Sequence, residues 1–237
     1  MGGETMIHDF KAEDMDFDLR TIDDNAFEVS FFEGVDLKKM NTLQWFQFCK
    51  ANKSFGEPGI SEYELAALHR ACEKSFGKEP INIVETGMCY GVTTRYFLIR
   101  NLKYGGTLTN FEIFTREKFE VAMRKLNLWN NIIRKGHSIK DHYEGGIDML
   151  WIDSEHALED ALGEYMRFRV WLNGNSVIGF HDTDCCPGVA QAIKMIQEVD
   201  DLELIEESTL VGGAGCQIFK MKTRNRTDRD WNNGLRK

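Results

Sequence analysis

Short, almost continuously apolar runs alternate with longer stretches of helical periodicity between residues 81 and 221. The apolar runs predict strands at 81–86, 107–113, 131–135, 147–153, 176–181, 203–207 and 216–221. The stretches between them predict helices at 91–103, 115–127, 155–172 and 187–199. Strands without polar alternation are buried on both faces. This order is therefore typical of an α/β protein whose parallel sheet is covered by helices on each side.

Two further helices are predicted before the first strand. Ser61 with Glu64 is a capping box that opens a helix to about residue 76. Asn41 could cap an earlier helix that reaches about residue 55, before the break at Gly56–Gly59. We divide the chain into an N-terminal extension with a helical cap, a sheet domain and a polar C-terminal tail, at residues 1–78, 79–222 and 223–237.

The helix predicted at 155–172 carries one apolar stripe and should end at Asn173-Gly174, because glycine commonly follows a helix end. We expect the stripe to face the sheet, since its residues recur at helical spacing. The stripe consists of Ala157, Leu158, Ala161, Leu162, Tyr165 and Met166.

The 237-residue chain is acidic, and this argues against some classes of binding partner. The formal net charge is −9, whereas nucleic-acid binding normally needs a basic face, so we expect no nucleic-acid partner. The chain has no run of about 18 apolar residues, so we expect no membrane partner. The first 24 residues lack the apolar core of a secretion signal, and the six cysteines are scattered. We therefore expect a cytoplasmic protein with reduced thiols. Separately, the aromatic N-terminal region could form the surface of a homo-oligomer.

A glycine turn directly follows the first predicted strand. The strand ends in Glu85 and Thr86, and Gly87 and Gly91 bracket the turn that leads into the next helix. Glycines allow a ligand to approach the backbone closely, and a helix start offers free N–H groups. Because the carboxylate of Glu85 would repel a pyrophosphate, the turn favours a ligand with a cationic or hydroxyl-rich end.

The later strands also end in polar or ionisable residues. Glu112 ends the second strand, 21 residues beyond Gly91, where an acid suits the two hydroxyls of a ribose. Gly136-His137-Ser138 follows the third strand. Asp153 with His156 follows the fourth strand, and His181-Asp182-Thr183-Asp184 ends the fifth. Since the carboxyl ends of parallel strands meet at one edge of a sheet, these groups should converge on one site.

These motifs, in this order, resemble the class I S-adenosylmethionine-dependent methyltransferases, especially the catechol-O-methyltransferase-like enzymes that act on small molecules. The resemblance covers about residues 81–221. It is carried by Glu85-Thr86-Gly87 with Gly91-Val92-Thr93, by Asn110-Phe111-Glu112, by Gly136-His137-Ser138, by Asp148 to Asp153, and by Gly179-Phe180-His181-Asp182. The stretch Ile152 to His156, taken with His181-Asp182-Thr183 and Pro187-Gly188-Val189, is also similar to a bacterial and phage subgroup of sugar or natural-product methyltransferases.

The resemblance implies a Rossmann-like, doubly wound sheet of seven strands, the last antiparallel, in a methyltransferase domain at 79–222. It implies transfer of a methyl group from S-adenosylmethionine to a hydroxyl of a small-molecule acceptor. The turn residues Gly87, Gly91 and Thr93 would hold the methionine part of this cofactor. Glu85 would lie near the cofactor's ammonium.

The other strand ends receive their roles from the same resemblance. Glu112 would accept hydrogen bonds from both ribose hydroxyls, and Ser138 would contact the adenine. Asp153 and Asp182 match two carboxylates that hold a magnesium ion in metal-dependent relatives. Asp153 would also contact the cofactor and be a catalytic residue. His156 falls where those relatives place a catalytic base, and an imidazole suits proton removal near neutral pH.

The sequence departs from that family at the third magnesium ligand, which leaves the metal open. The relatives commonly carry Asn or Asp directly after the second carboxylate, where this chain has Thr183, with Asp184 one residue late. Asp153 and Asp182 could instead cap helices, and Cys185-Cys186 could be either reactive or inert.

Three other classes of protein remain as alternatives. The spacing Gly-x-x-x-Gly argues against a nicotinamide-dependent oxidoreductase, whose turn is Gly-x-Gly-x-x-Gly. A nucleic-acid methyltransferase is disfavoured by the acidic charge and by the absence of an Asn/Asp-Pro-Pro-aromatic signature after the fourth strand. A non-catalytic binding module with a methyltransferase fold, acting within a larger complex, would fit the acidic N-terminal extension.

Overall fold

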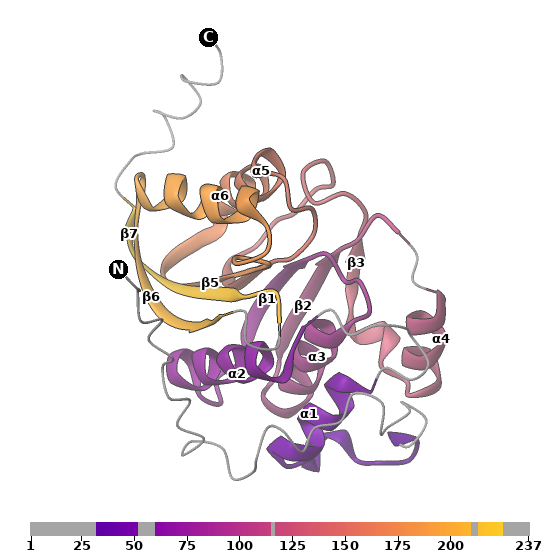
Figure 1. The fold of residues 1–237 in the computed structure, drawn as a ribbon. Coiled ribbons are helices and arrows are strands. Elements are labelled where there is room, and N and C mark those ends of the chain that lie inside the picture. The colour runs from indigo at the N-terminus through magenta and orange to yellow at the C-terminus, as the bar shows by residue number, and fades with distance from the viewer. Residues whose placement is uncertain (1–31, 52–59, 115–116, 210–212, 225–237) are drawn as a thin grey trace.

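The computed structural model describes residues 32–51, 60–114, 117–209 and 213–224. Its strands form one sheet and its helices lie on both sides of that sheet (Figure 1). The strands are β1 (Ile81–Thr86), β2 (Gly106–Phe111), β3 (Ile133–Lys135), β4 (Ile147–Ile152), β5 (Leu172–His181), β6 (Asp200–Ser208) and β7 (Cys216–Arg224). The α-helices are α1 (Thr42–Lys50), α2 (Glu62–Phe76), α3 (Val92–Tyr104), α4 (Glu117–Lys125), α5 (Leu158–Phe168) and α6 (Pro187–Gln197).

The seven strands have the order β3-β2-β1-β4-β5-β7-β6. All pairs from β3 to β5 are parallel, and β7 runs antiparallel to both of its neighbours. The chain order reverses between β1 and β4, which is where open α/β sheets place a ligand. The predicted fold class, including the antiparallel last strand, is confirmed.

Each face of the sheet contributes to a separate hydrophobic core. Helices α2 and α3 lie against one face, with α1 packed on them, and α5 and α6 lie against the other face (Figure 1). Strand β4 shows the alternation clearly, because Met149 and Trp151 point into the first core while Leu150 and Ile152 point into the second. Burial on both faces explains why the sequence of this strand is continuously apolar.

The N-terminal helices begin at the predicted caps. The hydroxyl of Ser61 accepts a hydrogen bond from the Glu64 N–H, and the Glu64 carboxylate accepts one from the Ser61 N–H. Asn41 and Gln44 form the equivalent pair at α1. Helix α1 ends at Lys50, five residues earlier than predicted, and the Gly56–Gly59 break lies outside the described residues.

The predicted helix at 155–172 is wrong at both ends. Helix α5 starts at Leu158, because the preceding loop packs against Gly188, where a Cβ atom would lie 2.5 Å from the His156 carbonyl oxygen. It ends at Phe168, and β5 already begins at Leu172. Strand β5 is longer than predicted because its register with β4 shifts, and Asn173 to Asn175 are accommodated as an irregularity.

Some predictions lie outside the described residues. These are the first 31 residues of the N-terminal extension, the start of the helix predicted at 115–127, and the tail beyond residue 224. Phe32 is described, and its ring packs edge-on against Phe48 at 5.0 Å. No helix in the described part of the chain combines the length and apolar composition needed to cross a membrane. The three-part division of the chain stays a prediction.

Candidate active site

A cavity of about 650 Å³ lies at the carboxyl ends of the parallel strands. Its walls come from the segments that follow β1, β2, β3, β4 and β5, so segments far apart in sequence meet at one edge of the sheet. The predicted site residues in these walls are Gly87, Glu112, Ser138, Asp153, His156 and Asp182. The convergence expected from the parallel-sheet pattern is therefore present.

Gly87 lets the turn after β1 pass directly over the end of β4. Its φ is +77°, and a Cβ atom on Gly87 would lie 2.0 Å from the carbonyl oxygen of Asp153. Its N–H donates to the Phe111 carbonyl at 2.8 Å, which ties the turn to the end of β2 as well. Only glycine fits this place, because both the conformation and the space exclude a side chain.

Glu112 is held by backbone N–H groups on two sides. Its Oε2 accepts hydrogen bonds from Met88 at 3.0 Å and Cys89 at 3.3 Å, and its Oε1 accepts one from Phe114 at 2.9 Å. A carboxylate offers about four lone-pair sites, so Oε1 can accept one further hydrogen bond. Glu112 is therefore preorganised at the cavity wall with acceptor capacity to spare.

Glu85, Gly91 and Thr93 do not line the cavity. The Glu85 carboxylate is fully buried and accepts hydrogen bonds from the hydroxyls of Thr93 and Thr94 and from the side-chain amide of Asn110. Burial outweighs these hydrogen bonds and raises the pKa of Glu85 to about 8. The carboxylate thus supports the turn from beneath, and the role of Glu85 near a cofactor ammonium stays a prediction.

The other two residues also support the turn from the protein side. The Thr93 hydroxyl donates to Glu85 at 2.6 Å. Gly91 adopts a left-handed conformation as the N-cap of α3, and a Cβ atom there would lie 2.1 Å from the ring of Phe119. Glycine is needed at position 91 because Phe119 of α4 packs against it. From the sequence alone, the same glycine was predicted to make room for a ligand.

His181 is a buried residue at the centre of the site. Its Nδ1 lies 3.0 Å from Asp153 Oδ1 and 3.0 Å from Asp182 Oδ2, and its Nε2 lies 3.4 Å from Glu64 Oε1. Burial opposes protonation of this ring, but the surrounding carboxylates outweigh that effect and raise the pKa of His181 well above its ordinary value. Burial of Asp182 is likewise outweighed by its hydrogen bond with His181, which lowers the Asp182 pKa.

His156 lies beside Asp182 at the solvent side of the site. Its Nε2 is 2.8 Å from Asp182 Oδ2, and 49% of its side chain is exposed. Within the described residues, its Nδ1 has no hydrogen-bond partner. A neutral ring that donates from Nε2 to Asp182 therefore presents a lone pair at Nδ1.

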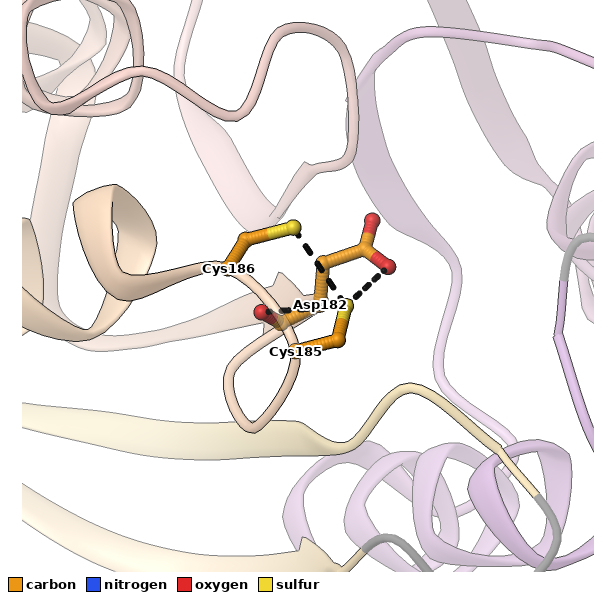
Figure 2. Close-up of side chains that lie close together, drawn as sticks. All are labelled: Asp182, Cys185 and Cys186. Atoms are coloured by element: carbon orange, nitrogen blue, oxygen red, sulfur yellow. Dashed lines mark hydrogen bonds between the residues drawn. The ribbon is translucent and has the colours of Figure 1, made fainter.

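Two vicinal thiols approach Asp182 from the loop before α6. The thiol of Cys185 donates to Asp182 Oδ1 at 3.2 Å and lies 3.3 Å from the Cys186 sulfur (Figure 2). The pKa of the Cys185 thiol is raised to about 12, first by burial and then by its hydrogen bonds with Cys186 and Asp182. A raised thiol pKa disfavours the reactive thiolate.

Glu164, a buried carboxylate that also lines the cavity, was not predicted from the sequence. It accepts hydrogen bonds from the hydroxyls of Thr86 at 2.7 Å and Ser154 at 2.6 Å, and its pKa is raised by burial. It connects the ends of β1 and β4 to α5. Its position on the buried face of the helix beside Ala161 and Tyr165 was the available signal, because an acid on that face needs partners.

Comparisons with known proteins agree with this architecture. Residues 84–183 match the family model described as a methyltransferase domain. An O-methyltransferase from Bacillus cereus in complex with SAH shares the fold with a TM-score of 0.58 at 15% identity, over 81% of this chain and 96% of that one. The O-methyltransferase TomG from Streptomyces achromogenes, in complex with SAM, shares the fold with a TM-score of 0.55 at 13% identity, over 82% of this chain and 95% of that one. No curated protein matches the sequence.

Cofactor-bound Rv0187 from MTB also shares the fold, with a TM-score of 0.58 at 12% identity over 82% of this chain and 96% of that one. Residues 84–183 thus resemble a methyltransferase domain, and the chain has the fold of these solved O-methyltransferases. Both findings agree with the resemblance seen in the sequence.

Proposed function

We propose that this protein binds S-adenosylmethionine in the cavity at the strand ends and transfers its methyl group to a hydroxyl of a small molecule. The observation that carries the proposal is the convergence on one cavity of Glu112, which follows β2, with Asp153 and His156, which both follow β4. Its volume of about 650 Å³ lies within the usual range for small-molecule sites. The acidic net charge of −9 supports an acceptor other than nucleic acid.

The residues of the cavity suit the parts of the cofactor in order. Glu112 is preorganised to accept a hydrogen bond from a ribose hydroxyl at Oε1. Ser138, which lies at the wall after β3, and the exposed side chains of Ile113 and Phe114 offer a polar contact and an apolar edge for the adenine. Asp153 takes the role first given to Glu85, because it is the carboxylate that lines the cavity next to the Gly87 turn.

Bound S-adenosylmethionine would supply a methyl group that the sulfonium charge already activates. His156 would accept the proton of the acceptor hydroxyl at Nδ1, while its Nε2–H donates to Asp182. The cofactor would give up the methyl group and leave as S-adenosylhomocysteine, while His156 would keep the proton of the acceptor hydroxyl. Asp182 stabilises the charged ring that results, and the cavity walls hold the reacting atoms in line.

The two carboxylates that the resemblance gives to a magnesium ion, Asp153 and Asp182, lie close together. With His181 they place ligand atoms within 4.8 Å of one another, so these residues could hold a cation. Magnesium prefers hard oxygen ligands, which the two carboxylates supply. The hydroxyl of Thr183, the next residue, is buried and has no partner among the described residues. A magnesium ion held there would lower the pKa of the acceptor hydroxyl.

Calorimetric titration with S-adenosylhomocysteine and, separately, with NAD⁺ tests the proposed class. We expect S-adenosylhomocysteine to bind with a Kd of about 10 μM or lower, and NAD⁺ to bind at least about a hundredfold more weakly. Tighter binding of NAD⁺ would favour the oxidoreductase alternative. Absence of S-adenosylhomocysteine binding at about 1 mM would overturn the proposal. We also propose that the enzyme is cytoplasmic, that it forms a homo-oligomer and that it has no membrane partner.

A further inference from the structure

Two neighbouring cysteines, Cys185 and Cys186, lie beside Asp182 in the loop between β5 and α6. The Cys185 sulfur is 3.3 Å from the Cys186 sulfur and 3.2 Å from Oδ1 of Asp182 (Figure 2). These two sulfurs and a carboxylate oxygen of Asp182 all lie within 4.8 Å of one another. The cysteines do not line the cavity, so the proposed methyl transfer leaves them without a role.

Backbone hydrogen bonds fix the turn that carries these three side chains. The N–H of Cys186 donates to the Asp182 carbonyl at 3.0 Å and closes the turn. The N–H groups of Asp184 and Cys185 donate to the Ala214 carbonyl at 3.1 and 3.3 Å, which ties the turn to the segment before β7. The two thiols and the carboxylate are therefore held together by the backbone of the protein.

The start of α6 favours negative charge at this place. Cys186 is the N-cap residue of this 11-residue helix. A helix N-terminus stabilises a nearby anion, including a thiolate. Because cysteine coordinates a metal as the thiolate, the position of Cys186 supports its use as a ligand.

The sulfurs are accessible and suitably spaced for a soft metal ion. Cys185 is exposed and Cys186 is half-buried, so an ion can reach both from solvent. Thiolate ligands select ions such as zinc over magnesium. Around a tetrahedral zinc ion, two sulfurs lie about 3.8 Å apart, and a sulfur and an oxygen about 3.5 Å apart. The printed spacings are shorter by at most about half an ångström, which small side-chain rotations can supply.

We propose that Asp182, Cys185 and Cys186 form a binding site for a thiophilic divalent cation of the Zn²⁺ type beside the cavity. Two metal–sulfur bonds form as the two thiol protons pass to solvent, and water completes the coordination. No group is oxidised or reduced. The inference goes beyond the proposed function and does not depend on it.

The thiol site and the candidate magnesium pair use Asp182 differently. Oδ2 of Asp182 lies 2.8 Å from His156 and 3.0 Å from His181, whereas Oδ1 is the oxygen that the Cys185 thiol contacts. The carboxylates of Asp153 and Asp182 suit a hard ion, and the sulfurs suit a soft one. The two sites therefore differ in the ion that they prefer and in the residues that they need besides Asp182.

Titration of the reduced, metal-free protein with Cd²⁺ tests the proposal, because Cd²⁺–thiolate bonds give an ultraviolet charge-transfer band. We expect the band to saturate at a single ion per chain and excess Zn²⁺ to displace the Cd²⁺. In Cys185→Ser and in Cys186→Ser, the Cd²⁺ affinity should fall at least about tenfold. Cys89→Ser is the matched control, because Cys89 lies at the cavity wall outside this cluster, and it should bind Cd²⁺ like the native protein.

Two carboxylate variants separate the thiol site from the candidate magnesium pair. Asp182→Asn should weaken Cd²⁺ binding at least about tenfold, whereas Asp153→Asn should leave the affinity within about twofold. Excess Mg²⁺ should not displace the Cd²⁺. Displacement by Mg²⁺, or an equal loss of affinity in Asp153→Asn, would assign the ion to the two carboxylates and overturn the proposal.

A measurement on the native protein keeps the proposal testable if a variant does not fold. X-ray absorption at the zinc edge, with equimolar Zn²⁺, reports the atoms bound to the metal. We expect two sulfur ligands at about 2.3 Å and oxygen ligands in the remaining positions. A zinc ion with no sulfur ligand, absence of the Cd²⁺ band in the native protein, or native Cd²⁺ affinity in both serine variants would overturn the proposal.

Discussion

Nε2 of His156 lies 2.8 Å from Oδ2 of Asp182, the same oxygen that Nδ1 of His181 contacts at 3.0 Å. One carboxylate oxygen therefore links a half-exposed histidine to a buried one. The buried ring holds Asp182 in place, and Asp182 in turn fixes the orientation and tautomer of His156. The candidate base is thereby positioned by residues from the ends of β4 and β5.

Removal of this base should slow methyl transfer without weakening cofactor binding. We expect His156→Ala to lower kcat by about 10²- to 10⁴-fold, because general-base assistance would be lost. Its affinity for S-adenosylhomocysteine should stay within about twofold, since the ring is assigned to the acceptor's proton. Turnover is measured as S-adenosylhomocysteine release with an acceptor found in a screen of catechols and hydroxylated sugars.

The control for this variant is His142→Ala. His142 is a surface histidine that also contacts a carboxylate, Glu144, at 2.9 Å, but neither residue lines the cavity. Its kcat should equal that of the native protein. A native kcat in His156→Ala would remove His156 from the mechanism.

The Gly87 turn should tolerate no side chain. In Gly87→Ala, the new Cβ would meet the Asp153 carbonyl at 2.0 Å, and the residue would have to keep a φ of +77°. We expect the free energy of unfolding to fall by at least about 2 kcal/mol, from backbone strain and displacement of the β4 end. Urea unfolding gives the value.

Gly146→Ala is the matched control for this substitution. A Cβ at Gly146 would meet nothing within 4 Å, and its φ does not lie in the left-handed region. We expect a change within about 0.5 kcal/mol. Equal stability of the two variants would contradict the tight passage of the Gly87 turn over Asp153.

Glu85 should make the stability of the protein depend on pH. Burial raises its pKa to about 8 in the folded state, from an ordinary value of 4.5. Below the ordinary value, the group is protonated in both states and imposes no cost. Between the two values the folded state binds the extra proton, so the free energy of unfolding falls as pH rises, by at most about 1.4 kcal/mol per pH unit. Above about 8 the loss is complete.

Glu85→Gln removes this titration and keeps a hydrogen-bonding side chain. The stability difference between the native protein and this variant should therefore shift against the native protein as pH rises from 4.5 to 8. Urea unfolding at several pH values measures the difference. A difference that is constant across this range would show that Glu85 is already ionised in the folded state.

The strand pattern could be predicted because local sequence determines it. Buried parallel strands such as β4 are apolar on both faces, and their polar ends mark the edge where a site forms. Helix α5 was predicted too long because its ends depend on distant contacts. These are the close approach of Gly188 to its start and the register shift between β4 and β5 at its other end.

The partners of the charged residues could not be predicted in the same way. The pattern identified Glu85 as an acid at a strand end, but its burial depends on the hydroxyls of the following helix and on Asn110 from β2. Likewise, nothing local to Glu64 shows that it faces His181, since α2 and β5 are brought together only by the fold. Spacing predicts which residues reach the edge of the sheet, whereas tertiary packing decides which face the ligand.

The central claim is that the cavity holds S-adenosylmethionine with its ribose on Glu112. Calorimetric titration of Glu112→Ala with S-adenosylhomocysteine tests it most directly, with Glu144→Ala as a surface-carboxylate control. We expect the Glu112 variant to lose about 2–3 kcal/mol of binding free energy, because charge-assisted hydrogen bonds are lost, and the control to bind like the native protein. The claim would be contradicted if the native protein, Glu112→Ala and Glu144→Ala all bound S-adenosylhomocysteine with equal affinity.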